Sequence, residues 1–197
     1  NAIDIDLSDT TTEQTVATNL YITFDSFIDD VIGTDYDDTI TGNSGLNNIS
    51  GGAGNDTINI SGTAGADVID GGTGDDTVNY LTASDAISAT IGSGGMSVQI
   101  SGTSDVQTIT NVENISGTNN DDTFYISGAV STTINAQGGT DAVDYSGLGD
   151  AINVDLSTGV GNVSGTSSSD DHTLQDVEDV MGSLYDDNIV GNDSNNT

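Results

Sequence analysis

The chain has 197 residues, of which 32 are Asp or Glu and one is His, while Lys, Arg and Cys are absent. The formal net charge of -32 excludes nucleic acid and disfavours anionic membrane surfaces as partners, because both bind through Lys and Arg. The absence of Cys excludes disulfides and thiolate metal sites. Carboxylates about 4 Å apart repel by roughly 4 kcal/mol at an effective dielectric near 20, so a compact fold needs an external cation, most naturally a divalent metal.

Two other interpretations of this composition are open: a disordered acidic tail, and a halophile-type acidic surface on an ordinary fold. Against disorder stand the 33% hydrophobic content, the regular spacing of β-branched residues and the absence of Pro. The sequence has no signal-peptide pattern at Asn1 and no apolar run of about 18 residues, so no membrane insertion is expected. The lack of Cys suits a secreted bacterial protein.

Three stretches of alternating polar and apolar residues open related blocks, at residues 2–7, 86–91 and 151–156. In each block a Gly follows 31 positions after the opening Ala, at Gly33, Gly117 and Gly182. The constant offset predicts three tandem blocks. They cover residues 1–85, with the best repeats at 33–79, residues 86–150, with degenerate repeats, and residues 151–197, where the repeat stops partway. We expect the chain to be a window from a longer tandem protein.

Within the first block, glycines recur every nine residues. The period runs through Gly33, Gly42 and Gly51 and resumes after two inserted residues at Gly62 and Gly71. Residues 51–59 and 71–79 match the pattern G-G-x-G-x-D-x-U-x in full, where U is a large apolar residue, and residues 62–70 lack only the second Gly. The motifs resemble the RTX, or haemolysin-type calcium-binding, family, and nearly the whole chain is similar to tandem-repeat segments of long secreted bacterial RTX proteins.

The residue types of this motif suit calcium. Gly permits φ > 0 and turns carbonyl oxygens to one side of a tight loop, and Asp adds a carboxylate. Calcium takes six to eight oxygen ligands at about 2.3–2.6 Å, more than one such loop supplies, so two stacked loops are required. The candidate ligands are Asp38, Gly51, Gly52, Gly54, Asp56, Gly62, Gly65, Asp67, Gly71, Gly72, Gly74 and Asp76 in the first block, and Asp122, Asp141 and Asp187 in later frames.

The resemblance implies an all-β fold, a right-handed parallel β-roll or β-solenoid of about 18 residues per coil, with longer strand-rich coils interspersed. In each x-U-x tripeptide the middle residue points inward. These inward residues are Ile40, Ile49, Ile58, Ile69, Val78, Phe124, Val143 and Ile189. Alternate frames stack on one edge and hold the ions between them. The expected stacks are Asp38 on Asp56 and Asp56 on Asp76 along one edge, and Asn47 on Asp67 along the other.

Several frames depart from the motif. Asn47 in place of Asp weakens its site, and Tyr36 in place of the fourth Gly predicts a turn that caps rather than binds. Thr132 replaces Asp in the second block, where fewer ions are expected. The strands at residues 86–91, 97–100 and 151–156 are expected to extend or flank the roll as larger coils. Glu113 and Glu178 are either solvated turn residues or calcium ligands at a block boundary.

Catalysis is not expected, because the chain has no Cys or Lys and its one His, His172, is predicted to be solvated in a loop. The predicted function is a calcium-dependent structural module of a secreted extracellular assembly, such as a surface layer, filament, matrix or adhesin stalk. Two alternatives stay open: an adhesin module that binds a ligand, and a passive C-terminal roll of a type I-secreted exoenzyme. The expected partners are calcium ions and further copies or repeats stacked end to end on uncapped solenoid ends.

Overall fold

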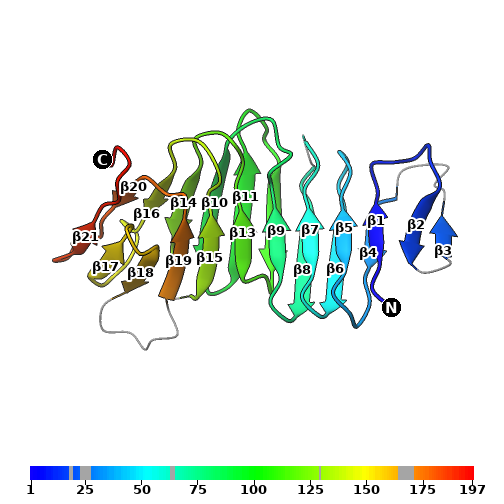
Figure 1. Cartoon of the computed structure of the whole chain (residues 1–197), viewed down its shortest axis with the longest axis horizontal. Coiled ribbons are helices and arrows are strands. Elements are labelled where there is room, and N and C mark those ends of the chain that lie inside the picture. The colour runs from blue at the N-terminus through cyan, green and yellow to red at the C-terminus, as the bar shows by residue number, and fades with distance from the viewer. Residues whose placement is uncertain (18–19, 23–27, 63–64, 129, 164–170) are drawn as a thin grey trace.

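A computed structural model describes residues 1–17, 20–22, 28–62, 65–128, 130–163 and 171–197, with the backbone alone for residues 20–22 and 162–163. Over these residues the chain forms strands and no helix, which confirms the all-β prediction. Among the described residues there is therefore no helix that is long and apolar enough to cross a membrane. The strands stack side by side along one long axis, and the two termini lie near opposite ends of the stack (Figure 1).

Two long sheets and one hairpin account for the described strands. The first sheet has the spatial order β1 (Asp4–Asp6), β5 (Thr39–Thr41), β7 (Thr57–Asn59), β9 (Thr77–Asn79), β13 (Asn114–Ser116), β15 (Thr132–Asn135), β19 (Asp171–Gln175), β18 (Val160–Val163), β17 (Ile152–Asp155) and β21 (Asn188–Val190). The second sheet has the order β4 (Asp30–Ile32), β6 (Asn48–Ala53), β8 (Val68–Thr73), β12 (Val106–Thr110), β11 (Gly95–Ile100), β10 (Ile87–Gly92), β14 (Thr123–Ile126), β16 (Ala142–Asp144) and β20 (Asp179–Met181). The hairpin pairs β2 (Gln14–Ala17) with β3 (Leu20–Ile22).

From β4 onward, and apart from β10–β12 and β17–β19, successive strands alternate between the two sheets, so that each pair of strands and its two turns form one coil of a β-roll. The coils pair in parallel, with Ile40 beside Ile58 and Ile58 beside Val78. Each of these side chains is fully buried between the sheets, and burial of one such residue contributes about 1.5–3 kcal/mol. The x-U-x tripeptides therefore form the core that the repeat predicts.

One residue predicted to point inward is only partly covered. Ile189 is 42% exposed, whereas Ile49, Ile69, Phe124 and Val143 are at most 1% exposed. The reason is the position of its strand: β21 is the last strand of the first sheet and pairs only with β17 among the described strands. Ile189 pairs with the buried Val154, so its side chain lies on the inner face of the sheet, but no strand of the described residues lies beyond β21 to cover it.

The longer strands extend the two sheets, as expected, but as antiparallel meanders rather than as larger coils. In the second sheet, β10, β11 and β12 are antiparallel neighbours. In the first sheet, β17, β18 and β19 repeat this arrangement. The first strand of each meander then pairs in parallel with a strand later in the chain, β10 with β14 and β17 with β21. The meanders thus lie within the stack and alternate between its two faces.

The β1 end of the stack is covered, contrary to the expectation of an uncapped end. The side chain of Gln14, at the start of β2, accepts the N–H of Asp6 at 2.8 Å and donates to the carbonyl of the same residue at 2.6 Å. Val16 of β2 is 4% exposed and Leu7 is fully buried. The hairpin therefore protects both the polar edge of β1 and the apolar interior beside it.

His172, predicted to be solvated in a loop, is 1% exposed and lies in β19. Its Nδ1 lies 3.3 Å from the hydroxyl of Tyr145, which is also fully buried, and the two ring centroids are 5.6 Å apart. Because His172 pairs with Thr132 in the first sheet, the side chain of His172 points to the interior. The only His of the chain is therefore part of the core rather than of a solvent-exposed loop.

Candidate metal centre

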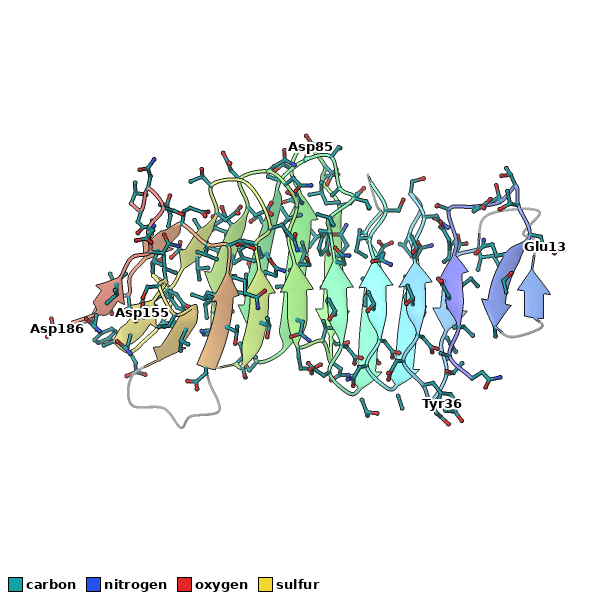
Figure 2. All side chains as sticks on the ribbon, viewed as in Figure 1. Glu13, Tyr36, Asp85, Asp155 and Asp186 are labelled. Atoms are coloured by element: carbon teal, nitrogen blue, oxygen red, sulfur yellow. The ribbon has the colours of Figure 1, made fainter. Side chains whose placement is uncertain are left out.

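The turns of the roll lie in two rows, one along each edge of the stack. We call edge A the row of turns that lead from the second sheet to the first, and edge B the row that leads back. Figure 2 shows Tyr36, from edge A, and Asp85, from edge B, at opposite margins of the stack, with polar side chains gathered along both. The two rows are the places where loops from successive coils stack.

Glycines give the edge A turns their shape. Gly52 and Gly54 have φ values of 113° and 115°, and Gly72 and Gly74 have φ values of 108° and 149°. L-residues with a Cβ rarely adopt such φ values. A Cβ at Gly72 would lie 2.0 Å from the carbonyl oxygen of Gly52 in the neighbouring coil. The second and fourth glycines of the motif are thus required by both conformation and close stacking.

The Asp residues of the motif form buried stacks along both edges. On edge A, Oδ1 of Asp56 accepts the backbone N–H of Asp38 at 2.8 Å, and Oδ1 of Asp76 accepts that of Asp56 at 2.7 Å. On edge B, Oδ1 of Asp67 accepts the N–H of Asn47 at 2.8 Å. These are the stacks that alternate frames predict, and all five side chains are at most 2% exposed.

The other carboxylate oxygen of four stacked residues has no hydrogen-bond partner among the described residues. This holds for Oδ2 of Asp56, Asp67, Asp76 and Asp141, each of which is buried. A buried acceptor without a partner costs about 1–3 kcal/mol, and more when it is charged. Because the chain contains no Lys or Arg, no such side chain can offset this cost, and it falls to a bound cation or, in part, to a proton on the carboxyl group.

On edge A, a carbonyl oxygen from the next coil meets the carboxylate of the turn at the first Gly of the frame. A Cβ at Gly51 would lie 2.3 Å from Oδ2 of Asp56 and 2.5 Å from the carbonyl oxygen of Gly71. At Gly33 the same position lies 2.5 Å from Oδ2 of Asp38 and 2.1 Å from the carbonyl oxygen of Gly51. The missing side chain thus opens a notch in which hard oxygens of two coils converge, as calcium requires.

The donor set is mixed, and this explains the absence of an all-side-chain site. No cluster of three or more His, Cys, Asp or Glu side chains occurs in the described part of the chain. Two stacked turns instead offer carbonyl oxygens together with one carboxylate from each turn. The residues present therefore fit calcium, which accepts six to eight such oxygens, and they would hold it between the loops.

The remaining predicted ligands fall into two groups. Gly62 has a φ of 51°, and Gly65 packs against the backbone of Gly45 in the neighbouring coil, while Thr63 and Ala64 of that frame lie outside the described residues. Asp122, Asp141 and Asp187 occupy equivalent turns in later blocks. Oδ1 of Asp141 accepts the N–H of Asp122 at 2.7 Å, and Asp122 and Asp187 accept the N–H groups of Ile87 and Ile152 at 2.7 and 2.9 Å.

Two Glu residues end the stacks, a role that the sequence did not reveal. Oε2 of Glu113 accepts the N–H of Asp76 at 2.9 Å, and Oε2 of Glu178 accepts that of Asp141 at 3.0 Å. Each Glu occupies the place that an Asp takes in the preceding coil, so the solvated-turn interpretation is wrong. Each Glu precedes a frame glycine by four positions, Gly117 or Gly182. This shared spacing was the signal in the sequence, but it did not indicate which backbone N–H groups the two side chains bind.

Burial raises the pKa of the stacked carboxyl groups. Desolvation is the main cause for Asp67, whose pKa rises from 3.8 to about 6, and for Asp141, whose pKa rises to about 7. The pKa values of Asp56, Asp76 and Asp122 are also raised, mainly by burial. Protons can thus partly replace a cation at these turns, because either one neutralises the buried charge.

We expect acid to stabilise the calcium-free chain. A carboxyl group whose pKa is raised in the folded state binds more protons there than in the unfolded state. Stability is therefore present below the unfolded pKa near 3.8 and is lost as pH rises through about 6 to 7. In EDTA, far-UV circular dichroism should show a stronger β-sheet signal at pH 5 than at pH 8. A signal that is equal or stronger at pH 8 would contradict this account; light scattering controls for aggregation.

Comparison with known proteins agrees with these turns. The family model for the RTX calcium-binding nonapeptide repeat, in four copies, matches residues 25–58 and 59–86. No curated protein matches the chain. The matched residues include the Gly33, Gly51, Gly62 and Gly71 frames, whose glycines and Asp carboxylates build the stacked turns described above. Repeats of this family are structural and bind several calcium ions. Residues 25–86 therefore carry RTX calcium-binding nonapeptide repeats, and the cofactor that such repeats bind is calcium.

Proposed function

We propose that this chain is a structural segment of a secreted extracellular assembly, such as a surface layer, filament, matrix or adhesin stalk, and that it folds when it binds calcium outside the cell. It performs no catalysis in this proposal. Its role is structural: calcium neutralises carboxylates that otherwise repel one another, and the chain then folds into a stiff stack of coils. The proposal extends from the matched repeats to the whole chain.

The observation that carries the proposal is the row of buried carboxylates in a chain without basic residues. Asp38, Asp56 and Asp76 stack within successive coils of edge A, yet the chain has no Lys or Arg to balance them. At low calcium these charges repel and oppose folding. Extracellular modules of this kind bind calcium at about 0.1 to 1 mM, so the free energy of binding would become free energy of folding outside the cell.

A division into three blocks, residues 1–85, 86–150 and 151–197, is part of the proposal. Three equivalent bonds support it: the N–H groups of Ile3, Ile87 and Ile152 each donate to an Asp that lies 35 residues later in the sequence. Each bond attaches the opening strand of a block to a stacked turn. The parallel pairs β1 with β5, β10 with β14 and β17 with β21 follow directly from these attachments.

End-to-end growth of the stack is supported by the β20–β21 end. Met181 of β20 is 59% exposed, and Ile189 and Val190 of β21 are 42% and 43% exposed. Each of these two strands is the last described strand of its sheet, and an unpaired strand edge can accept a further strand. A further coil stacked there would bury these side chains.

Electron microscopy of the calcium-loaded chain tests the assembly role. Filaments or sheets that appear with calcium and dissolve in EDTA are the expected result. Sedimentation velocity at the same concentrations gives the mass of the species in solution. Monodisperse monomers at saturating calcium, together with specific binding to a glycan or to ice, would contradict the structural role and favour a ligand-binding module.

A further inference from the structure

Edge A ends its row of Asp turns at a turn of a different type. The sheet registers place Asn111 beside Gly71 and Glu113 beside Asp76, so three residues occupy the space of a six-residue nonapeptide turn. Asn111 makes the shorter turn possible with a φ of 51°. The longer side chain of Glu113 then reaches the N–H of Asp76, as an Asp does in a full-length turn.

These four residues form what we call the Glu113 corner: Gly71, Asp76, Asn111 and Glu113. A Cβ at Gly71 would lie 2.1 Å from the carbonyl oxygen of Asn111 and 2.7 Å from Oδ2 of Asp76. That Oδ2 is buried and accepts no hydrogen bond from any described residue, and Asp76 is fully buried. The corner therefore brings together two carboxylates and a carbonyl around a notch.

We propose that the Glu113 corner is a calcium site, with one half from the nonapeptide turn that ends at Asp76 and the other from the Asn111–Glu113 turn. The inference depends on the proposed binding of calcium by the Asp turns and adds a ligand that lies outside the repeat motif. Asp76 Oδ2 and the Asn111 carbonyl oxygen are ligands, and so is Glu113, one oxygen of which is engaged by the N–H of Asp76.

Solvent can complete the coordination of this ion. Edge A opens beyond the corner into a cleft of about 490 Å³, lined by Asn111, Glu113, Thr132 and the turn between β10 and β11. Calcium commonly keeps water among its six to eight ligands. A site at the end of the row is thus reached from the cleft.

The chain contains a natural contrast at the Glu178 corner of edge B. Asp176 and Glu178 lie beside Ala136 and Asp141, the φ of Asp176 is 55°, and Glu178 accepts the N–H of Asp141 at 3.0 Å. The two corners differ at the notch, where Ala136 stands in place of Gly71. Its methyl group occupies the position on which the oxygens of the Glu113 corner converge. Oδ2 of Asp141 is buried without a hydrogen-bond partner among the described residues, as Oδ2 of Asp76 is, so the methyl group of Ala136 is the feature that separates the two corners. In this proposal the Glu178 turn holds no ion because that methyl group fills the notch.

Native mass spectrometry of the calcium-loaded full chain can count the ions at each corner. Glu113→Gln removes the charge but keeps an oxygen for the N–H of Asp76, and Glu178→Gln makes the same change at the other corner. We expect Glu113→Gln to bind one calcium ion fewer than wild type, and Glu178→Gln to bind as many. Far-UV circular dichroism at saturating calcium checks that both variants fold.

An equal ion count for wild type and Glu113→Gln, or the same loss in Glu178→Gln, would overturn the inference. If Glu113→Gln does not fold, Ala136→Gly decides: it opens the notch at the Glu178 corner and should gain one ion, and no gain overturns the inference. A wild-type chain that binds no calcium would contradict the proposed function instead. A wild type that binds calcium together with an unaffected Glu113→Gln would overturn this inference and leave the proposed function standing.

Discussion

Replacing Asp56 by Asn is expected to raise the calcium concentration needed for half-saturation by about tenfold to a hundredfold. Asp56 stacks between Asp38 and Asp76, so its carboxylate serves two neighbouring turns of edge A. Loss of a charged partner typically costs about 1.5–3 kcal/mol, and each 1.4 kcal/mol is tenfold in affinity. Isothermal titration calorimetry of the variant gives the affinity and the number of ions.

The variant should still fold at high calcium, because the chain already contains a turn with Asn at this position. Asn47 accepts the N–H of Asn43 through Oδ1 at 2.8 Å and donates from Nδ2 to the carbonyl of Ile28 at 3.2 Å. Asp85→Asn is the matched control, since Asp85 is exposed and its removal changes the net charge equally. Equal affinities for the two variants would show that total charge, not the stacked carboxylate, sets calcium binding.

Replacing Gly72 by Ala is expected to destabilise the calcium-bound roll by roughly 2–6 kcal/mol. Two causes combine. The φ of 108° strains any residue with a Cβ, and the new methyl group would lie 2.0 Å from the carbonyl oxygen of Gly52. Backbone cannot rotate away as a side chain can, so the two coils must separate. Urea unfolding at saturating calcium, followed by circular dichroism, measures the change.

Two other Gly-to-Ala variants separate these causes. Gly62 has a φ of 51° but no atom within 4 Å of its Cβ position, so Gly62→Ala should cost only about 1–2 kcal/mol. Gly94 lies exposed in open space, and Gly94→Ala should change stability by less than about 0.5 kcal/mol. A Gly72→Ala variant as stable as Gly94→Ala would show that the coils do not stack as closely as described.

The parts of the fold that depend on short sequence motifs could be predicted. The frame of Gly51 to Asp56 places its turn glycines, its carboxylate and the inward Ile58 within nine residues, so local rules determine all of them. The stacking of Asp38 on Asp56 then follows from counting frames, because strands alternate regularly between the sheets. Such repeats build structure between neighbours, which is why one sequence suffices to predict it.

The parts that depend on distant pairing could not be predicted. The β10–β12 meander lies between β8 and β14, and the positions of these two strands set the direction in which its strands pair. The sequence does not give this direction, because polar and apolar residues alternate in the same way in parallel and antiparallel strands. The burial of His172 depends on its register with Thr132. Glu113 accepts the N–H of Asp76, which lies 37 residues earlier in the sequence. The turn that ends at Glu113 is three residues shorter than a nonapeptide turn, so a search for a constant repeat length does not align Glu113 with the Asp residues.

The central claim is that calcium binding folds this chain, and a calcium titration followed by far-UV circular dichroism tests it most directly. Starting in EDTA at pH 8, calcium should produce a β-sheet spectrum in one cooperative step, EDTA should reverse it, and magnesium at equal concentration should fail to reproduce it. A spectrum that is already that of β-sheet in EDTA and does not change with calcium would contradict the claim, and would favour an acidic fold that needs no bound metal.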